Sequence, residues 1–263
     1  MKKGKKKKKK KRDKTTPWEI STNRYVGFVD IMGFKDMLTR LSHNEVYDIM
    51  KKVAKSVSSV QSVFSVDYES EADIDVNVTM MLYSDSIMIY TRDDQQHSLE
   101  NLVASISTLS DSLFSDGIPH KGAIAFGQMT LDFANSIFFG QPLVDAYLLQ
   151  EELKFYGIAV HGTAEKSEDI FDDESIFEYN CPLKNGSAKH LTIAPGVSLT
   201  EDFEEKTVDT LIEKVFKMRE NTSGSLRKYI DNTIEYLDNV KSKGLQILKE
   251  EEDEFNEEEN GSS

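Results

Sequence analysis

The sequence predicts an α+β fold in which helices cover one face of a β-sheet. The predicted strands and helices follow one another along the chain, and a β-hairpin stands in the middle. The 263 residues, 38% of them hydrophobic, are sufficient for one large domain with a core. No apolar run approaches the roughly 20 residues that a membrane-spanning helix needs.

Short apolar segments rich in β-branched and aromatic residues predict the strands of the first half of the chain. These strands cover residues 24–29, 78–83 and 87–90, and a tight turn over 84–86 joins the last two. Apolar residues at three- and four-residue spacing predict helices over 35–64 and 99–114.

The second half continues with a strand over 121–127 and a hairpin turn. Phe138-Phe139-Gly140 then leads into a helix from about 142 to 155, which a strand over 158–160 follows. We expect further strands within 177–193, around 182–186, and two late helices, over about 204–220 and 223–249.

Charge is distributed unevenly along the chain. Residues 1–14 carry a local charge of +10, whereas residues 250–259 hold eight carboxylates and the whole chain carries −14. Like-charge blocks repel and bury nothing, so we expect a disordered basic tail over 1–22, one domain over 23–249 and a disordered acidic tail over 250–263. We do not expect a nucleic-acid partner, because the acidic body would repel a phosphate backbone.

The single cysteine, Cys181, excludes an internal disulfide and a cysteine-based zinc site. The basic N-terminal segment has no apolar stretch behind it and therefore does not read as a secretory signal. We accordingly expect a cytoplasmic protein that has no membrane partner. The five histidines show no metal-ligand spacing.

Two aspartates carry the chemistry. Asp30 ends the first strand and precedes a turn containing Gly33, which lets the backbone approach a ligand closely. Asp85 stands 55 residues later, at the tip of the hairpin. If strand and hairpin are neighbours in the sheet, the carboxylates converge next to a helix N-terminus that favours phosphate, which suits Mg²⁺ or Mn²⁺. A single aspartate after a strand is more often a cap or turn residue, so the hypothesis depends on both motifs together.

A third pattern completes a family resemblance. Gly122 to Gly127 reads Gly-Ala-Ile-Ala-Phe-Gly, and Phe139-Gly140 opens the helix that follows. With the Asp-Ile-Met-Gly-Phe turn and the Tyr-Ser-Asp-Ser hairpin, this order resembles class III nucleotidyl cyclases over about residues 24–160. The resemblance implies a ferredoxin-like βαββαβ core with added strands and C-terminal helices. It also implies a homodimer that forms its active sites at the interface.

The resemblance further implies that Asp30 and Asp85 are the catalytic residues and bind two Mn²⁺ or Mg²⁺ ions with the backbone carbonyl of Ile31. The backbone at Met32, Gly33 and Phe34 would contact the triphosphate of a nucleoside triphosphate substrate. One ion would help the ribose 3′-oxygen to attack the α-phosphorus, and the other would support the leaving pyrophosphate.

The chain departs from the family at the positions that usually read ribose and base. Val144 and Leu148 stand where the family carries an Asn and an Arg. Thr79 or Met81, and Ile137, stand where purine-selective members carry a Lys and an Asp. The usual purine-reading pair is therefore missing.

Four other residues are candidate nucleotide contacts. Lys121 and Lys154 could supply positive charge to phosphates in place of the missing Arg, although surface lysines usually have no such role. Tyr25 and Tyr147 could contact the base, although tyrosines at such positions are more often part of the core.

A second resemblance covers most of residues 24–240. Asp-Ala-Tyr-Leu-Leu-Gln-Glu, Pro-Leu-Lys-Asn-Gly and the segment over 228–237, with the motifs above, look like the Pycsar pyrimidine cyclases of bacterial anti-phage defence. This resemblance implies synthesis of cyclic UMP or cyclic CMP and a separate effector that binds the product; we favour UTP as substrate. Two alternatives stay open: an adenylate or guanylate cyclase with atypical base contacts, and a catalytically inactive nucleotide-sensing domain.

Overall fold

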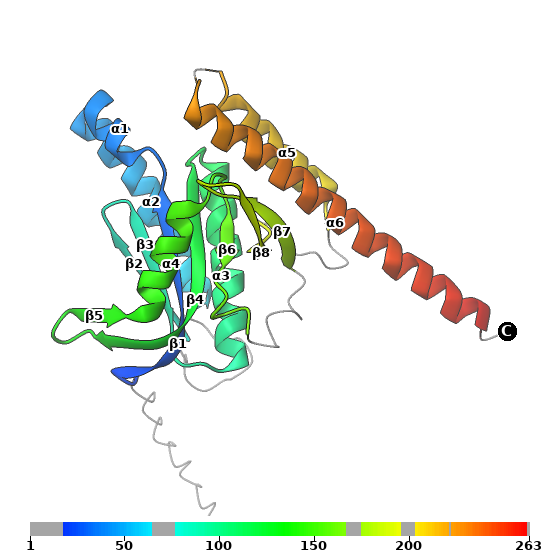
Figure 1. Cartoon of the computed structure of the whole chain (residues 1–263), viewed down its shortest axis with the longest axis horizontal. Coiled ribbons are helices and arrows are strands. Elements are labelled where there is room, and N and C mark those ends of the chain that lie inside the picture. Colours follow the sequence, from blue (N-terminus) through cyan, green and yellow to red (C-terminus); the bar gives the residue numbers. More distant parts are fainter. Residues whose placement is uncertain (1–17, 65–76, 167–174, 196–202, 221, 262–263) are drawn as a thin grey trace, which may run out of the picture.

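The computed structural model describes residues 18–64, 77–166, 175–195, 203–220 and 222–261. The strands are β1 (Ser21–Ile31), β2 (Val78–Tyr83), β3 (Ser86–Thr91), β4 (His120–Asp132), β5 (Ile137–Gly140), β6 (Ile158–Val160), β7 (Ile176–Pro182) and β8 (Ser187–Ile193). The helices are α1 (Phe34–Arg40), α2 (His43–Phe64), α3 (Gln96–Ser115), α4 (Gln141–Glu152), α5 (Glu205–Lys217) and α6 (Ser225–Gly261). Figure 1 shows their arrangement.

One eight-stranded sheet organises the domain, in the order β2-β3-β1-β4-β6-β8-β7, with β5 paired to the far end of β4. The central strand β1 is antiparallel to both β3 and β4, whereas β4 and β6 are parallel. The mixed α+β fold predicted from the sequence is confirmed. Each strand's alternate residues face opposite sides of the sheet, so Asp30 shares a face with Phe28 and not with Val29.

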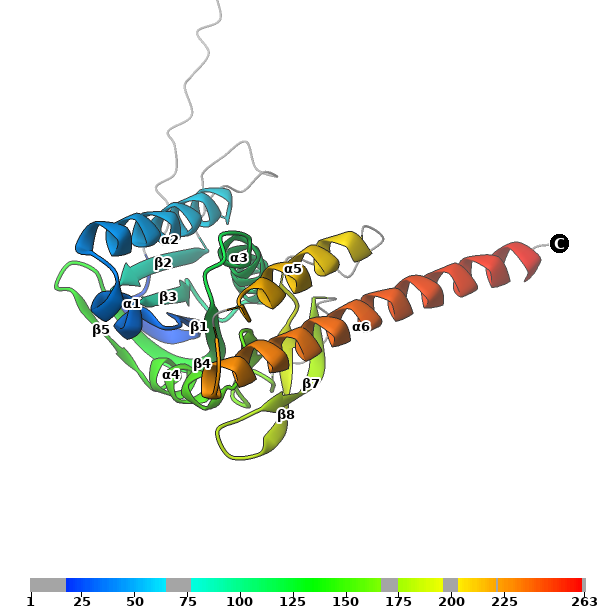
Figure 2. The ribbon, with the colours of Figure 1, turned by 90° about the horizontal axis from the view of Figure 1, so that it is seen from above.

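Helices cover both faces of the sheet, which corrects the expectation of a single covered face. Figure 2 shows α2 and α3 on one side and α4 on the other. Under α2 and α3 lies a core that includes Tyr25, Val29 and Ile31 of β1, whereas Phe28 packs with Ala146 of α4 on the opposite face. The α4 helix was predicted, but its low amphipathicity gave no signal for the face on which it packs.

The helix predicted over 35–64 is interrupted, and α1 and α2 are separate. Ser42 and Glu45 form a capping box: the Ser42 amide donates to the Glu45 carboxylate at 2.8 Å, and the Glu45 amide donates to the Ser42 hydroxyl at 3.4 Å. This pairing satisfies backbone groups that a helix N-terminus leaves without partners, so a new helix begins here.

The strands expected within 177–193 are confirmed as β7 and β8, and residues 183–186 form the turn between them, with Gly186 at φ 82°. Helix α6 continues to Gly261 and so includes most of the segment 250–263 that was expected to be disordered, because glutamate-rich sequence retains good helix propensity. In Figures 1 and 2, α6 extends well past the sheet. Most of the predicted basic tail, residues 1–17, lies outside the described residues.

None of the helices in the described ranges has the length and hydrophobicity needed to span a bilayer.

Candidate functional site

Asp30 and Asp85 meet at one end of the sheet, where β1 ends and the β2–β3 hairpin turns. Asp30 is in register with Ser86, the residue that follows Asp85. The Ile31 amide donates a hydrogen bond to the Asp85 carbonyl oxygen at 2.8 Å. The hairpin itself is tight, since Ser84 adopts φ 56°. The first strand and the hairpin are therefore sheet neighbours, as expected, and the two aspartates come together.

The pKa of Asp30 is raised by its burial and by the nearby Asp85. Partial burial disfavours the ionised carboxylate and is the largest cause of a rise to about 6, and the neighbouring Asp85 charge adds to it. Lys121 acts in the opposite direction and lowers the pKa of Asp30. Two adjacent carboxylates of this kind carry an excess of negative charge that a bound cation would compensate.

Lys121 lies directly opposite Asp30, on β4. Its side chain is buried, and its ammonium donates a hydrogen bond to the Glu151 carbonyl oxygen at 3.3 Å. Burial lowers the pKa of Lys121, and the nearby charges of Glu151 and Asp30 counteract this effect. A lysine buried at this place in the sheet is not an ordinary surface lysine, which favours its candidacy as a site residue.

Lys154 belongs to the same polar cluster. Its ammonium lies 4.8 Å from the centre of the Tyr229 ring, and that of Lys121 lies 5.9 Å from the same ring. Lys184 forms an ion pair with the Glu151 carboxylate at 3.2 Å. We call these five residues the lysine cluster: Lys121, Glu151, Lys154, Lys184 and Tyr229. It gathers three lysines, from β4, from the connection between α4 and β6 and from the β7–β8 turn, and Lys121 is the one that acts on Asp30.

Three members of the lysine cluster, Glu151, Lys184 and Tyr229, were not singled out from the sequence as site residues. Lys184 stands in the β7–β8 turn within the Pro-Leu-Lys-Asn-Gly motif, and Tyr229 stands in the segment over 228–237. Both segments were noted as family-like, and that was the available signal. Sequence alone could not pair them with Lys121, because the contacts join residues 30 to over 100 positions apart.

The backbone amides of the turn after β1 differ in whether they can bind a ligand. Gly33 adopts φ 80°, a left-handed conformation that glycine accepts without strain, and it caps the N-terminus of α1. The Met32 amide already donates to the Pro119 carbonyl oxygen at 2.8 Å, so it is not free to bind a phosphate oxygen. The first α1 amides lie beyond the reach of intrahelical acceptors, which leaves Gly33 and Phe34 as the candidate phosphate contacts.

The two candidate tyrosines lie on different sides of the sheet. Tyr25 is buried in the core under α2 and α3 and packs against Phe126, with ring centres 4.7 Å apart. It faces away from Asp30 and does not fit the predicted base contact. Tyr147 of α4 is 45% exposed and packs edge-on against Phe28, on the face that Asp30 shares.

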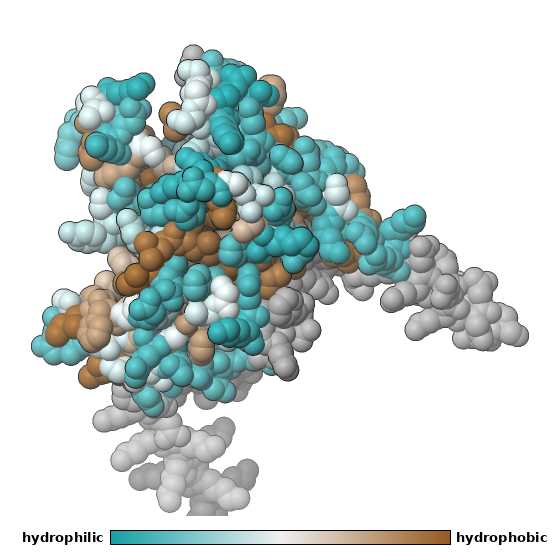
Figure 3. Space-filling model, in the orientation of Figure 1, coloured by the Kyte–Doolittle hydropathy of each residue, from teal (hydrophilic) through white to brown (hydrophobic). Residues whose placement is uncertain are grey.

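An exposed apolar surface surrounds the positions where the family usually carries polar residues. Val144 and Leu148 of α4 are 48% and 55% exposed, and Ile137 of β5 is 48% exposed. Together with Tyr147 and Phe139 they are the large apolar side chains that α4 and β5 expose, and we call this set the α4–β5 surface. Figure 3 shows hydrophobic residues gathered over α4 on this side of the molecule. Large exposed apolar patches on folded domains are typical of interaction sites.

The paired aspartates have the chemistry of a divalent-metal site. Within the described ranges, no group of three or more His, Cys, Asp or Glu side chains could hold a metal ion. Asp30 and Asp85 would therefore need other oxygen ligands, and the Ile31 carbonyl and substrate phosphates are of the type that Mg²⁺ and Mn²⁺ prefer. The raised pKa of Asp30 fits this role, because bound cations would remove the repulsion that causes part of the rise.

The fold is that of the class III nucleotidyl cyclases. The chain resembles the catalytic core of a rhodopsin-guanylyl cyclase with converted specificity in complex with ATPαS, with TM-score 0.51 and 12% identity over 66% of this chain and 96% of that one. It also resembles the guanylyl cyclase Cya2, with TM-score 0.50 and 13% identity over 70% of this chain and 97% of that one. No protein-family model and no curated protein matches the sequence.

Proposed function

We propose that this protein is a nucleotidyl cyclase that converts a pyrimidine nucleoside triphosphate, UTP before CTP, into the 3′,5′-cyclic nucleotide and pyrophosphate. One observation carries the proposal: in a cyclase fold, Asp30 and Asp85 converge beside the turn that contains Gly33. A domain that only sensed nucleotides would not need both carboxylates at this point.

In this proposal, different residues bind the metal ions and orient the triphosphate. Asp30, Asp85 and the Ile31 carbonyl would hold two Mn²⁺ or Mg²⁺ ions. Such ions, when bound, activate the attacking ribose oxygen and stabilise the leaving pyrophosphate. The amides of Gly33 and Phe34 would orient the triphosphate, and positioning of this kind is a main source of rate enhancement in phosphoryl transfer.

Lys121 and Lys154 would supply the positive charge that the family usually draws from the Arg missing at Leu148. Lys121 is the stronger candidate of the two, because its ammonium is held within the lysine cluster opposite Asp30. A preorganised cation in a partly buried site stabilises developing charge better than a mobile surface cation.

The preference for pyrimidines rests on the residues that would face the base. Thr79, Met81 and Ile137 stand near the two positions where purine-selective cyclases use a Lys and an Asp. A purine there would lose partners for its ring nitrogens, and each unpaired buried polar group costs about 1–3 kcal/mol. One such loss corresponds to a preference of about tenfold. Tyr147, half-exposed on the Asp30 face, is the candidate for reading the pyrimidine edge.

The working unit would be a homodimer. The α4–β5 surface exposes five large apolar side chains on a chain with a single cyclase-like domain, and a two-fold axis would bury this patch against itself. Val144 and Leu148 would then contribute to the interface rather than to ribose binding. This accounts for apolar residues at positions where the family usually has polar ones.

The product would be a second messenger. In the resembled Pycsar systems, a pyrimidine cyclase signals phage infection and a separate cyclic-nucleotide-binding effector responds. We extend that role to this chain as part of the proposal.

A four-nucleotide assay tests the proposal. The purified protein is incubated with Mn²⁺ and each of UTP, CTP, ATP and GTP, and the products are resolved by mass spectrometry. We expect cyclic UMP or cyclic CMP, with kcat/KM for the better pyrimidine at least about tenfold above that for ATP or GTP. Equal values for ATP and the pyrimidines would favour an atypical purine cyclase. Tight nucleotide binding without any turnover would favour a sensor.

A further inference from the structure

A pocket of about 280 Å³ lies on the far side of the Met32–Gly33 turn from the β2–β3 hairpin. Its walls come from the turn itself, from Pro119 before β4, and from the end of α5 and the start of α6. Neither Asp30 nor Asp85 lines it. The pocket is thus next to the proposed active site but made largely of other residues.

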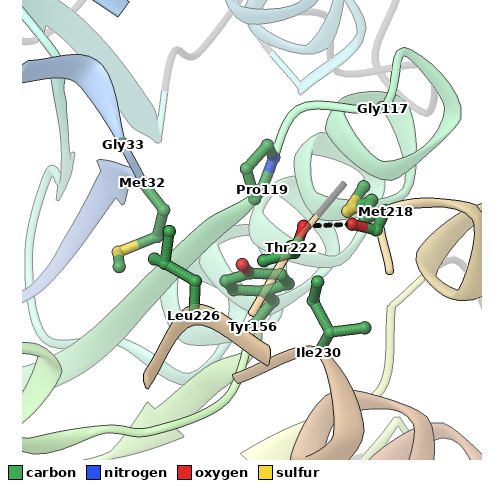
Figure 4. Close-up of a pocket in the computed structure, with 9 residues that line it drawn as sticks. All are labelled: Met32, Gly33, Gly117, Pro119, Tyr156, Met218, Thr222, Leu226 and Ile230. Carbon is green, nitrogen blue, oxygen red and sulfur yellow. Dashed lines mark hydrogen bonds between the residues drawn. The ribbon is translucent and has the colours of Figure 1, made fainter. Parts of the chain in front are cut away.

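The lining is mainly apolar and has a sulfur-rich, aromatic character. Met32 and Met218 stand on opposite sides, and the Tyr156 ring lies between them, as Figure 4 shows. Thioether groups adapt to irregular ligands and make favourable contacts with aromatic rings. Leu226, half-exposed, stands at the rim. These features suit a flat aromatic molecule rather than a phosphate or a sugar.

The hydroxyl groups of Thr222 and Tyr156 are the side-chain hydrogen-bonding groups in the lining of this pocket. Thr222 donates its hydroxyl proton to the Met218 carbonyl oxygen and so keeps lone pairs available to accept a hydrogen bond. Tyr156 is held rigidly, because its ring stacks on Tyr229 at 5.9 Å and its amide donates to Thr233. Burial raises the pKa of Tyr156 to about 12, so its hydroxyl stays protonated.

We infer that this pocket binds a small aromatic molecule that carries one hydroxyl group, and that the bound molecule regulates the proposed cyclase through the Met32–Gly33 turn. The volume lies just below the range typical of drug-sized ligands, which limits the occupant to one or two fused rings. The regulatory part rests on the proposed function. It follows from contact, since the occupant would touch Met32, whose amide binds Pro119 and whose chain neighbour Ile31 binds Asp85.

Binding is tested directly, without nucleotide, by fluorescence titration of the full chain with 2-naphthol. We expect saturable binding, a loss of affinity of at least about tenfold in Leu226→Trp, which would fill the rim, and little change in Leu245→Trp. Leu245 is a matched control because it is also exposed on α6, outside the pocket. No saturable binding, or equal weakening by both variants, would overturn the site.

A second variant tests whether the Tyr156 hydroxyl binds the hydroxyl group of the ligand. Tyr156→Phe keeps the ring and removes the hydroxyl, so it should weaken 2-naphthol several-fold and leave naphthalene, which has no hydroxyl, unchanged. Equal effects on the two probes would overturn the assignment of a hydroxylated ligand.

Titration of 2-naphthol in the presence of UTP and Mn²⁺ distinguishes coupling between two separate sites from competition for one shared site. Because coupling between two sites is reciprocal, saturating UTP should change the 2-naphthol affinity by a factor that reaches a plateau. A loss of affinity that grows without limit as UTP rises would show one shared site and overturn the inference. If the protein turns over no nucleotide, the titration of the apo protein still decides whether the pocket binds, so the two proposals fail separately.

Discussion

The Ile31 amide donates its hydrogen to the Asp85 carbonyl oxygen at 2.8 Å, which ties the end of β1 to the tip of the β2–β3 hairpin. Asp30 and Asp85 are 55 positions apart in the chain, yet this bond holds their backbones together. A change at either strand end would therefore disturb both carboxylates.

Replacing Asp30 by Asn should stabilise the metal-free protein at neutral pH. The folded-state pKa of Asp30 is about 6, above its usual 3.8, so folding favours the protonated form. Asp30 thus contributes stability below pH 4 and loses it as the pH rises through 6. In EDTA at pH 8, the Tm of Asp30→Asn should exceed that of the wild type by roughly 2–4 °C, the shift that about 1 kcal/mol produces at this size. The difference should vanish near pH 4.

Asp238→Asn, at an exposed position on α6, serves as the control for the loss of one surface carboxylate. An Asp30→Asn variant less stable than the wild type at pH 8 would mean that the carboxylate is stabilised by a partner and is not repelled by Asp85.

Lys121→Met should raise the pKa of Asp30 above its present value of about 6, because Lys121 is the cation that lowers it. Metal binding needs the ionised carboxylate, so the pH midpoint of Mn²⁺ binding should move to higher pH. Mn²⁺ titrations across pH 5–9, followed by electron paramagnetic resonance, measure this directly. Lys189→Met, an exposed lysine paired with Glu178, is the control and should leave the profile unmoved. An unchanged profile in Lys121→Met would remove Lys121 from the site.

Leu148→Asp should separate the proposed homodimer. Burying a charge in an interface made by the α4–β5 surface is costly, so the dimer dissociation constant should rise by at least about tenfold. Sedimentation velocity over a dilution series measures the change. Phe216→Asp is a matched control, since Phe216 is 54% exposed on α5, outside that surface. A wild-type protein that remains monomeric at working concentration while fully active would contradict the dimer.

Gly122→Ala should destabilise the fold although it adds one methyl group. A Cβ at this position would lie 2.5 Å from the Phe28 carbonyl oxygen and 2.8 Å from an Ile158 methyl group. The backbone cannot move freely here, so we expect a loss of about 1–3 kcal/mol in the free energy of unfolding. Gly162→Ala should be nearly neutral, because among the described residues its Cβ would meet nothing closer than 3.9 Å. Urea denaturation of both variants measures the difference, and equal stabilities would contradict the close approach of β4 to β1.

Local pattern was sufficient for the elements that carry the aspartates. The apolar run before Asp30 and the paired runs around Asp85 predicted β1, β2 and β3, since buried strands are short and β-rich. The sequence also contained a signal for the break between α1 and α2, the Ser42–Glu45 capping box. The signal was overlooked because apolar residues recur at helical spacing on both sides of it.

Contacts between residues far apart in the chain could not be predicted from the local sequence pattern. The pairing of Lys121 with Asp30, and the approach of Tyr229 to both lysines, depend on how β4 and α6 pack, and no spacing in the sequence records that. Tyr25 and Tyr147 looked equivalent in sequence, yet strand alternation turns Tyr25 into the core.

The most direct test of the central claim is cyclic nucleotide formation by Asp30→Ala and Asp85→Ala in the presence of UTP and Mn²⁺. Circular dichroism would confirm that each variant is folded, and Asp238→Ala would serve as the control that keeps wild-type activity. In the proposed site each carboxylate would help to hold both ions, so either loss should reduce the rate to no more than a few per cent of wild type, a fall of at least about 2 kcal/mol in transition-state stabilisation. A folded Asp30→Ala or Asp85→Ala variant that forms cyclic nucleotide at a rate near that of the wild type would contradict the two-aspartate site.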